Sequence, residues 1–350
     1  MDRQKAQSIP ALYGIRPARI EPVDSGLINR TFLVTGADGQ RHILQWVNPT
    51  FTAAVNADIE AITAHISRHG LLTPRLLRTA AGELCVPASE GHWRMLTWID
   101  GHTVHRATSD HLAQEAGRML GRFHAAVADF KQPFESNRAG VHDSARHFRH
   151  LRDTLAKRTN HPRFPVVATL GDDILRIAAT LPALPSLPER VVHGDPKISN
   201  FLFEPGTDRA LCMVDLDTVS RMPLPLELGD ALRSWCNLAG EDSRTAEFSC
   251  TRFGAALQGY ASSASHLLSA PEVQALIPAT HLIYVELAAR FCADALNEDY
   301  FAWDAARFSS HSEHSEIRAA GQLDAAKAMK RHDADLQPRV AAMFPASVSP

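Results

Sequence analysis

Short, mainly apolar runs of four to seven residues, the length of β-strands, are concentrated in the first hundred positions of the chain. Four runs have this strand pattern: Thr31–Thr35, His42–Val47, Glu83–Val86 and Trp93–Ile99. The first two flank Gly36-Ala-Asp-Gly39, in which Asp-Gly favours a hairpin turn. Ala53–His69 has helical spacing instead, and Gly70 is suited to end that helix. The pattern predicts a small N-terminal region built around antiparallel strands.

Helical spacing replaces the strand pattern after the first hundred residues. Apolar residues recur every three or four positions from Asp110 to Val127, and Ser109 is a candidate N-cap. Closely spaced prolines in Leu181–Pro188 predict a connector. Ser309–Ser315 contains two histidines, and we interpret it as an exposed polar connector. We therefore predict an α+β protein with two lobes, residues 1–99 and 100–350, the first strand-rich and the second mainly helical.

Composition narrows the classes of protein that this chain can represent. Of its 350 residues 45% are hydrophobic and 21% are charged, which is typical of a folded chain with a sizeable core. The formal net charge of −3 gives no argument for binding nucleic acid or a membrane surface. Five dispersed cysteines without a CxxC pair indicate reduced thiols. We expect a cytoplasmic protein without a membrane span or signal peptide, and a monomer or weak dimer.

Two acidic motifs in the second half of the chain carry the candidate chemistry. His193-Gly-Asp-Pro-Lys-Ile-Ser-Asn200 lies between apolar strand-like runs, and Val214-Asp-Leu-Asp217 follows the next run. Phosphoryl transfer from ATP requires a carboxylate beside the attacking hydroxyl and oxygen ligands for Mg²⁺. Asp195 fits the first role, and Asn200 and Asp215 fit the second. Strand alternation would place Asp217 on the same face as Asp215, where it would assist.

Each of these residues alone is compatible with a surface turn, since polar residues favour turns. Their combination is more informative: a strand, HxDxxxxN, two further strands and then DxD. The sequence therefore predicts a kinase site that uses ATP and Mg²⁺.

At these motifs the sequence resembles the aminoglycoside phosphotransferase and choline kinase superfamily, and more narrowly its N-acetylhexosamine 1-kinase branch. The supporting stretches are Gly26–Thr35, His42–Asn48, His193–Leu202, Val214–Thr218, Gly229–Arg233 and Arg290–Phe301. The resemblance implies a bilobal protein-kinase-like fold. It also implies transfer of the γ-phosphoryl group of ATP to the anomeric hydroxyl of a sugar, an N-acetylhexosamine, which gives a sugar 1-phosphate.

The third predicted strand departs from the kinase pattern. Kinases usually carry a lysine there for the ATP phosphates, whereas this strand has Gln45. Glu60, in the helix that follows, fits the position of the glutamate that normally pairs with that lysine. Lys197 lies two residues after Asp195, and we hypothesise that it supplies part of the missing positive charge. The alternative is a solvated surface lysine.

The resemblance also implies a set of nucleotide contacts: Gly26, Asn29, Thr31, Gln45, Thr97, Trp98 and Ile99. Gly26 would let backbone N–H groups approach phosphate, and Asn29 would add a side-chain contact. Adenine would lie against the backbone of Thr97–Ile99 with Trp98 as a wall. An ordinary hairpin turn at Gly26 and core packing of Trp98 are equally compatible with the sequence.

Further residues complete the predicted site. Asp230 resembles the buried aspartate that braces the catalytic loop at His193 or at nearby backbone amides, although its position also suits a helix N-cap. The resemblance implies that Arg290, Asp294 and Tyr300 face the sugar hydroxyls. Arg290 and Asp294 are four residues apart, so an intrahelical ion pair is the alternative.

Two other functions stay open at this point, and the first is a kinase of another small hydroxylated metabolite. A carboxylate-rich acceptor pocket would favour a cationic acceptor such as an aminoglycoside or a choline-like amino alcohol. A pocket built around Arg290 and neutral hydrogen-bonding groups would favour a sugar. The second is a non-catalytic nucleotide-binding pseudokinase, supported by Gln45 in place of lysine but opposed by the complete set of base and metal-binding residues.

Overall fold

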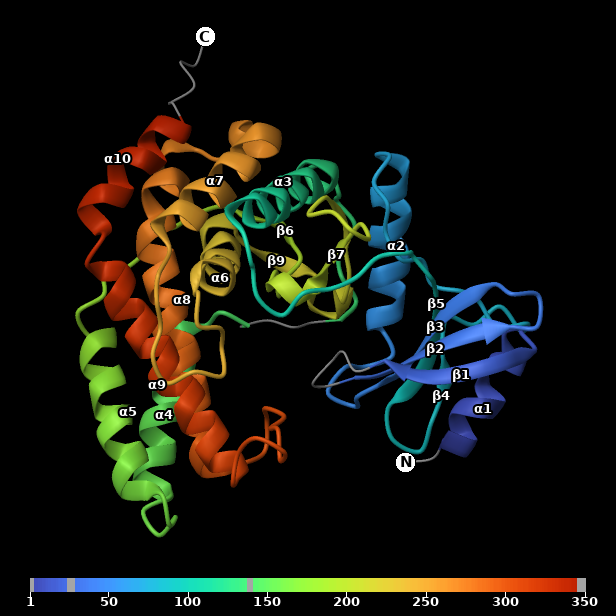
Figure 1. The fold of residues 1–350 in the computed structure, drawn as a ribbon, viewed down its shortest axis with the longest axis horizontal. Coiled ribbons are helices and arrows are strands. Elements are labelled where there is room, and N and C mark those ends of the chain that lie inside the picture. The colour runs from blue at the N-terminus through green and yellow to red at the C-terminus, as the bar shows by residue number, and fades with distance from the viewer. Residues whose placement is uncertain (1–2, 24–28, 137–140, 345–350) are drawn as a thin grey trace.

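The fold is described for residues 3–23, 29–136 and 141–344 of a computed structural model. A smaller lobe, to the right in Figure 1, contains a five-stranded sheet, and a larger helical lobe lies to the left. The predicted α+β architecture is confirmed. The sheet ends at Thr97 and the first helix of the larger lobe begins at Asp110.

The sheet of the smaller lobe is antiparallel, with strand order β1-β2-β3-β5-β4. Its strands are β1 Pro17–Val23, β2 Arg30–Gly36, β3 Arg41–Val47, β4 Val86–Pro87 and β5 His92–Thr97. The hairpin predicted around Asp-Gly is confirmed as β2 and β3, and Gly39 adopts a φ of 80° there. The strand predicted at Glu83–Val86 is wrong in extent, because only Val86–Pro87 pairs with β5. The chain also forms β1, which no expected run covered.

Two helices accompany this sheet. The helix α1, Arg3–Leu12, was not expected from the sequence and packs through Ala6 and Ile9 on a small core shared with the sheet. The helix α2, Val55–Arg68, confirms the predicted helix, and Gly70 follows it with a φ of 74°. The apolar residues of α2 join the main core of the larger lobe. This helix therefore connects the two lobes.

Eight long helices and two small two-stranded antiparallel sheets form the larger lobe within the described residues. The helices are α3 Asp110–Val127, α4 Ser144–Lys157, α5 Phe164–Ala178, α6 Leu224–Cys236, α7 Cys250–Ala264, α8 Ala270–Asn297, α9 His311–Lys330 and α10 Asp333–Met343. The small sheets are β6 Glu189–Val192 with β9 Ser220–Pro223, and the hairpin of β7 Phe201–Phe203 with β8 Ala210–Met213. The predicted cap is confirmed, since Ser109 Oγ accepts a hydrogen bond from Leu112 N at 2.9 Å. The proline-rich stretch 181–188 contains no helix or strand.

Two helices near the end of the chain are unusual: α8 is strongly apolar, and α9 begins inside a predicted connector. By length and composition α8 is able to cross a membrane, but 83% of its most apolar window is buried inside the protein, as in the core helix of a globular fold. The polar connector predicted at Ser309–Ser315 is wrong, because α9 begins at His311. Ser312, His314 and Ser315 are buried there, where hydrogen bonds satisfy their polar groups in part.

Candidate active site

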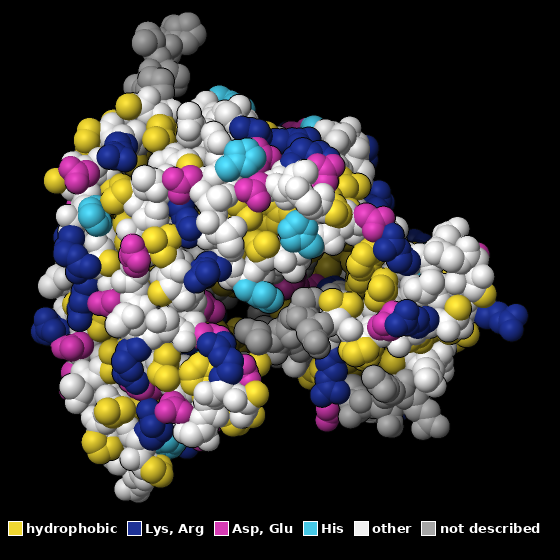
Figure 2. All heavy atoms as spheres, in the orientation of Figure 1, with side chains coloured by type: hydrophobic (Ala, Val, Ile, Leu, Met, Phe, Trp, Pro, Cys, Tyr) yellow, Lys and Arg dark blue, Asp and Glu magenta, His cyan; other side chains and the backbone are white. Residues whose placement is uncertain are grey.

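A cleft of about 1910 Å³ lies between the lobes. Figure 2 shows the surface hollowed where they meet, with basic and histidine side chains near the rim. Ligand pockets usually measure roughly 300–1,000 Å³, so this cleft has room for a nucleotide and a second small molecule. Strands β2, β3 and β5 line one side, and the two acidic motifs, α4 and α8 line the other.

Backbone constraints hold the catalytic loop, residues 193–200, in its shape. Gly194 has a φ of 85°, and a Cβ atom at this position would lie 2.2 Å from the carbonyl oxygen of Thr218, so only glycine fits. The buried carboxylate of Glu227 accepts hydrogen bonds from the amides of His193 at 2.8 Å and Gly194 at 2.9 Å. His193 Nε2 lies 2.9 Å from the carbonyl oxygen of Val214 and thereby ties this loop to the second acidic motif.

The bracing role predicted for Asp230 is therefore wrong, because Glu227 holds the amides. Asp230 lies inside α6, not at its N-cap, and its carboxylate accepts a hydrogen bond from Arg233 at 2.8 Å. Asp230 and Arg233 still line the cleft.

Asp195, Lys197 and Asn200 meet at the floor of the cleft. Lys197 Nζ lies 2.6 Å from Asp195 Oδ2, and Asn200 Nδ2 donates to the same carboxylate at 3.1 Å. Burial alone would raise the pKa of Asp195, but the Lys197 ammonium outweighs it and lowers this pKa below its usual value. Burial also opposes the charge on Lys197, yet the carboxylates of Asp195 and Asp215 raise its pKa. Both groups are therefore charged at neutral pH.

Asp215 presents its carboxylate to the cleft from an unusual backbone conformation. Its φ of 64° is left-handed, and the 3-10 turn Leu216–Thr218 follows it. The prediction that Asp215 and Asp217 share a strand face is therefore wrong, since β8 ends before both. In the described part of the chain nothing donates a hydrogen bond to the Asp215 carboxylate. Burial, followed by the charge of Asp217, raises its pKa.

These unpaired oxygens suit a hard divalent cation. The Asp215 carboxylate and the side-chain oxygen of Asn200 are the ligand types that Mg²⁺ takes. A cation would also relieve the repulsion that raises the pKa of Asp215. The residues present therefore fit Mg²⁺, and Asn200 and Asp215 would hold it.

Asp217 is engaged with the smaller lobe. Arg94 from β5 donates to its two carboxylate oxygens at 2.5 and 3.0 Å, and Asn29 Nδ2 donates at 2.7 Å. The side chains of Arg94 and Asp217 are 2% and 1% exposed. Arg94 also donates to Gln45 Oε1 at 2.8 and 2.9 Å. A guanidinium group thus lies beside the residue that replaces the kinase lysine. A metal-binding role for Asp217 stays a prediction.

The other predicted nucleotide contacts lie mostly in the same cleft. Thr31, Gln45, Thr97, Trp98 and Ile99 line it. Trp98 is half-buried and donates to Asp100 from its indole nitrogen at 3.0 Å. Gly26 lies outside the described residues.

Glu60 does not reach Gln45. One of its oxygens accepts instead from Arg78 at 3.3 Å.

The predicted acceptor residues lie at the α8 end of the cleft. Arg290 and Asp294 do not form the ion pair that was the alternative. The Arg290 guanidinium lies over the rings of Tyr300 and Phe301, at 5.9 and 5.6 Å from their centroids. Asp294 accepts from His311 at 2.7 Å and from the amide of Tyr300 at 2.8 Å, so it fixes the loop after α8. Tyr300 is 48% exposed.

Sequence reasoning missed Arg94 and Glu227. A lone arginine within the apolar run Trp93–Ile99 was the available signal for the first, because a buried charge requires a partner. The only signal for Glu227 was a carboxylate within the apolar stretch Leu224–Leu228.

A strand-rich lobe over a helical lobe, with an Asp-Lys-Asn loop and a second acidic motif in the cleft, defines a kinase-type phosphotransferase. Consistent with this, a family model described as the phosphotransferase enzyme family matches residues 19–263. This span is more than half of the chain, so the chain belongs to that family. It is accordingly a small-molecule kinase that uses ATP.

Solved structures confirm the fold. An amicoumacin kinase in complex with AMP-PNP, Ca²⁺ and Ami is 14% identical, with 93% of each chain covered and a TM-score of 0.62. A choline kinase from Cryptosporidium parvum is 14% identical, with 98% of this chain and 100% of that chain covered and a TM-score of 0.62. A microcompartment-associated aminopropanol kinase is 15% identical, with 96% of this chain and 98% of that chain covered and a TM-score of 0.61. Their acceptors differ, and at these identities the likeness concerns the fold alone.

Proposed function

We propose that this kinase phosphorylates the anomeric hydroxyl of a free sugar, an N-acetylhexosamine or a close relative. The observation that carries the proposal is the Arg290 guanidinium over Tyr300 and Phe301, with the exposed Tyr300 ring facing a cleft wide enough for a second molecule. An exposed ring offers an apolar face to the C–H groups of a pyranose, and a guanidinium group offers several donors to its hydroxyl and carbonyl oxygens.

The charges at this end of the cleft support a neutral acceptor over a cationic one. Most carboxylates that line it have partners: Asp230 and Glu241 form ion pairs with Arg233, Asp242 forms one with Arg318, and Asp294 accepts from His311, whereas Asp153 and Asp299 have no ion-pair partner in the described residues. By contrast, Arg146, Arg149 and Arg290 have no carboxylate partner in the parts of the chain that the structure describes. An ammonium-bearing acceptor would meet unpaired positive charge here, which disfavours choline-like and aminoglycoside acceptors.

The chemistry of the catalytic loop suits an acidic hydroxyl. Asp195 would orient the acceptor hydroxyl and take its proton, but the Lys197 ammonium lowers the pKa of this carboxyl and makes it a weak base. An anomeric hydroxyl is more acidic than an ordinary alcohol, so orientation by Asp195 suffices. Asn200 and Asp215 would hold Mg²⁺, which would supply positive charge against the negative charge that develops during transfer.

Arg94 is the residue that we assign to the missing charge of the third strand. It lies opposite Gln45 in the β3–β5 register, and its guanidinium contacts the Gln45 side chain. Its bond to Asp217 places a cation of the smaller lobe against the DxD motif of the larger one. Arg94 would thus hold the lobes at the separation that the nucleotide requires, and Lys197 would add charge at the transferring phosphoryl group.

A coupled assay of ADP release tests the acceptor class. The panel contains free hexoses, N-acetylhexosamines, aminoglycosides and choline, with Asp195→Asn as the baseline. We expect acceptor-dependent turnover with N-acetylhexosamines and phosphate on the anomeric oxygen by NMR. Preferred turnover of a cationic acceptor, or phosphate on a 6-hydroxyl, would overturn the proposal. The absence of turnover with every acceptor would instead favour the pseudokinase.

A further inference from the structure

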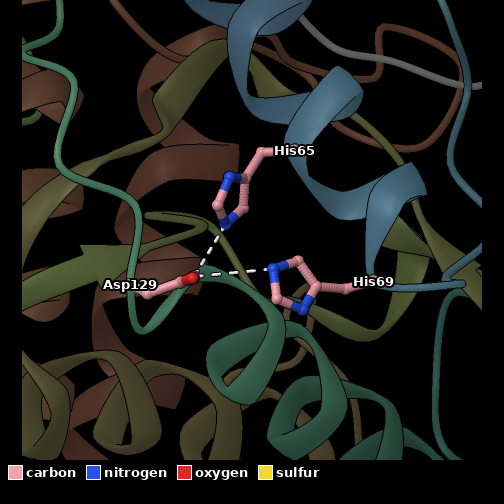
Figure 3. Close-up of side chains that lie close together, drawn as sticks. All are labelled: His65, His69 and Asp129. Carbon is pink, nitrogen blue, oxygen red and sulfur yellow. Dashed lines mark hydrogen bonds and ion pairs between the residues drawn. The ribbon is translucent and has the colours of Figure 1, made fainter.

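Two histidines and an aspartate converge on the surface away from the cleft. His65 lies in the last turn of α2, His69 caps that helix, and Asp129 follows α3. Figure 3 shows both rings pointing a nitrogen at the Asp129 carboxylate. His65 Nε2 lies 2.9 Å from Asp129 Oδ1, and His69 Nε2 lies 3.5 Å from the same oxygen. All three ligand atoms lie within 4.8 Å of one another.

These separations match the edges of a tetrahedral zinc site. Zinc takes histidine nitrogen and carboxylate oxygen at about 2.0–2.2 Å, so two ligands of a tetrahedron lie about 3.3 Å apart. The observed 2.9 and 3.5 Å fall on either side of that value. The i, i+4 spacing of the histidines places both rings on one helix face. The largest separation within the cluster is up to 4.8 Å, so side-chain rotations have to bring the ligand atoms closer to enclose an ion, and a fourth position stays open to water.

The surroundings of the three side chains favour a cation and fix one ligand. The negative end of the α2 dipole lies at this turn and attracts positive charge. The ring of His65 packs edge-on against Phe130, with centroids 5.2 Å apart, and its side chain is only 12% exposed. His69 and Asp129 are 40% and 67% exposed, so an ion has access from solvent. His65 is thus held in place by packing, whereas His69 and Asp129 are accessible. This combination suits a metal ion that exchanges with solvent.

We propose that His65, His69 and Asp129 form a binding site for zinc or a similar borderline divalent transition ion. Because α2 connects the lobes, the bound ion ties the end of α2 to the segment after α3. Two nitrogen ligands and one oxygen favour zinc over magnesium, which prefers oxygen ligands. The site therefore selects a different ion from the one that suits Asn200 and Asp215.

One neighbouring cation has to move for the ion to bind. Arg68 Nη2 lies 3.4 Å from His65 Nδ1, which favours the tautomer with a proton on Nε2. Metal binding at Nε2 requires the other tautomer, with the proton on Nδ1. Arg68 is exposed, so its guanidinium is free to swing into solvent.

The alternative is an ion pair between the aspartate and protonated histidines. The hydrogen bond from His65 lowers the pKa of Asp129, and such a pairing would also arise without a metal. The two cases differ in binding. A metal site takes up one zinc ion per chain and loses it when a ligand is removed, whereas an ion pair takes up none.

Isothermal titration of the full chain with Zn²⁺ in excess Mg²⁺ separates these cases. We expect saturable binding of one ion, weakened about tenfold or more in His69→Ala and in Asp129→Asn. His266→Ala removes an exposed histidine in the 3-10 turn Ser265–Leu267 and serves as the matched control, which should bind zinc like the unmodified chain. His69 and Asp129 are exposed, so their variants are expected to fold.

Two further readouts do not depend on kinase activity. Co²⁺ should give the intense d–d absorption of a tetrahedral site, and this band should be lost in both ligand variants. Zn²⁺ should raise the thermal unfolding temperature of the unmodified chain and the control, but not of the ligand variants. Equal zinc affinity in the unmodified chain and in both ligand variants would overturn the proposal, as would the absence of saturable binding.

Discussion

The catalytic loop and the acceptor end of the cleft are built in opposite ways. In residues 193–200 backbone and side chains are fixed by buried partners, among them Glu227 beneath the loop and Asn200 beside Asp195. At the acceptor end, the side chains of Arg290 and Tyr300 make no ion pair or hydrogen bond in the described residues, although the Tyr300 backbone amide donates to Asp294. The rigid catalytic loop determines the chemistry. At the open acceptor end, a few side chains determine which acceptor binds.

This contrast predicts that substitutions in the loop lower kcat, whereas substitutions at the acceptor end change the acceptor KM. Asp195→Asn should have the largest effect, a fall in kcat of about 10³-fold, because the amide cannot take the hydroxyl proton. The KM for ATP should change little. Steady-state ADP release measures both. Asp173→Asn, on exposed α5, is the matched control. An Asp195→Asn variant with near-normal kcat would exclude Asp195 as the base.

The raised pKa of Asp215 makes the stability of the metal-free protein depend on pH. Because its folded-state pKa is raised, the native chain binds this proton more tightly than the unfolded chain does. The metal-free protein therefore loses stability as the pH rises through that pKa. Asp215→Asn should raise its unfolding temperature at neutral pH, by about 2 °C.

The same proton competes with the metal. Mg²⁺ affinity should fall about tenfold per pH unit below the raised pKa, and Asp215→Asn should abolish stabilisation by Mg²⁺. Thermal unfolding across pH, with and without Mg²⁺, follows both effects. A variant that melts below the parent in the absence of metal would show that the Asp215 charge is not repelled in the folded site.

Substitution of Arg94 tests whether its contact between the two lobes is needed for ATP binding. Arg94→Gln should raise the KM for ATP about tenfold and leave the acceptor KM unchanged. Removing the cation alone leaves Asp217 buried and unpaired, which costs about 3–5 kcal/mol. The double variant Arg94→Gln with Asp217→Asn removes both charges, so it should regain stability without regaining ATP affinity. If the double variant binds ATP normally, Arg94 has a structural role only.

These regions also differ in how far the sequence predicts them. Asp195, Asn200 and Asp215 were identifiable because their spacing along one chain segment sets the geometry. Arg94 and Glu227 act on Gln45 and His193 across separations of 49 and 34 residues, so no local pattern reveals them. The two-lobe fold was predictable because short strand-like apolar runs give way to helical spacing after the first hundred residues. The helix α1 and the strand β1 were missed because tertiary packing, not strong periodicity, holds them.

Arg290 should have the smallest effect and the most selective one. Arg290→Gln keeps hydrogen-bonding capacity but removes the charge and the planar guanidinium that lies over Tyr300. We expect the acceptor KM to rise by about fivefold to tenfold, the loss of one charge-assisted hydrogen bond, with kcat and the KM for ATP nearly unchanged. Arg176→Gln, on the exposed face of α5, is the control.

The outcome for Arg290 separates the acceptor classes. A neutral sugar loses a donor in Arg290→Gln, so its KM rises. A cationic acceptor is relieved of repulsion, so its KM falls. If Arg290→Gln improves the KM for choline or an aminoglycoside and leaves that for sugars unchanged, then Arg290 excludes cations and does not hold the sugar. Specificity at this end would then come from repulsion, as in sites that discriminate by disfavouring the wrong ligand.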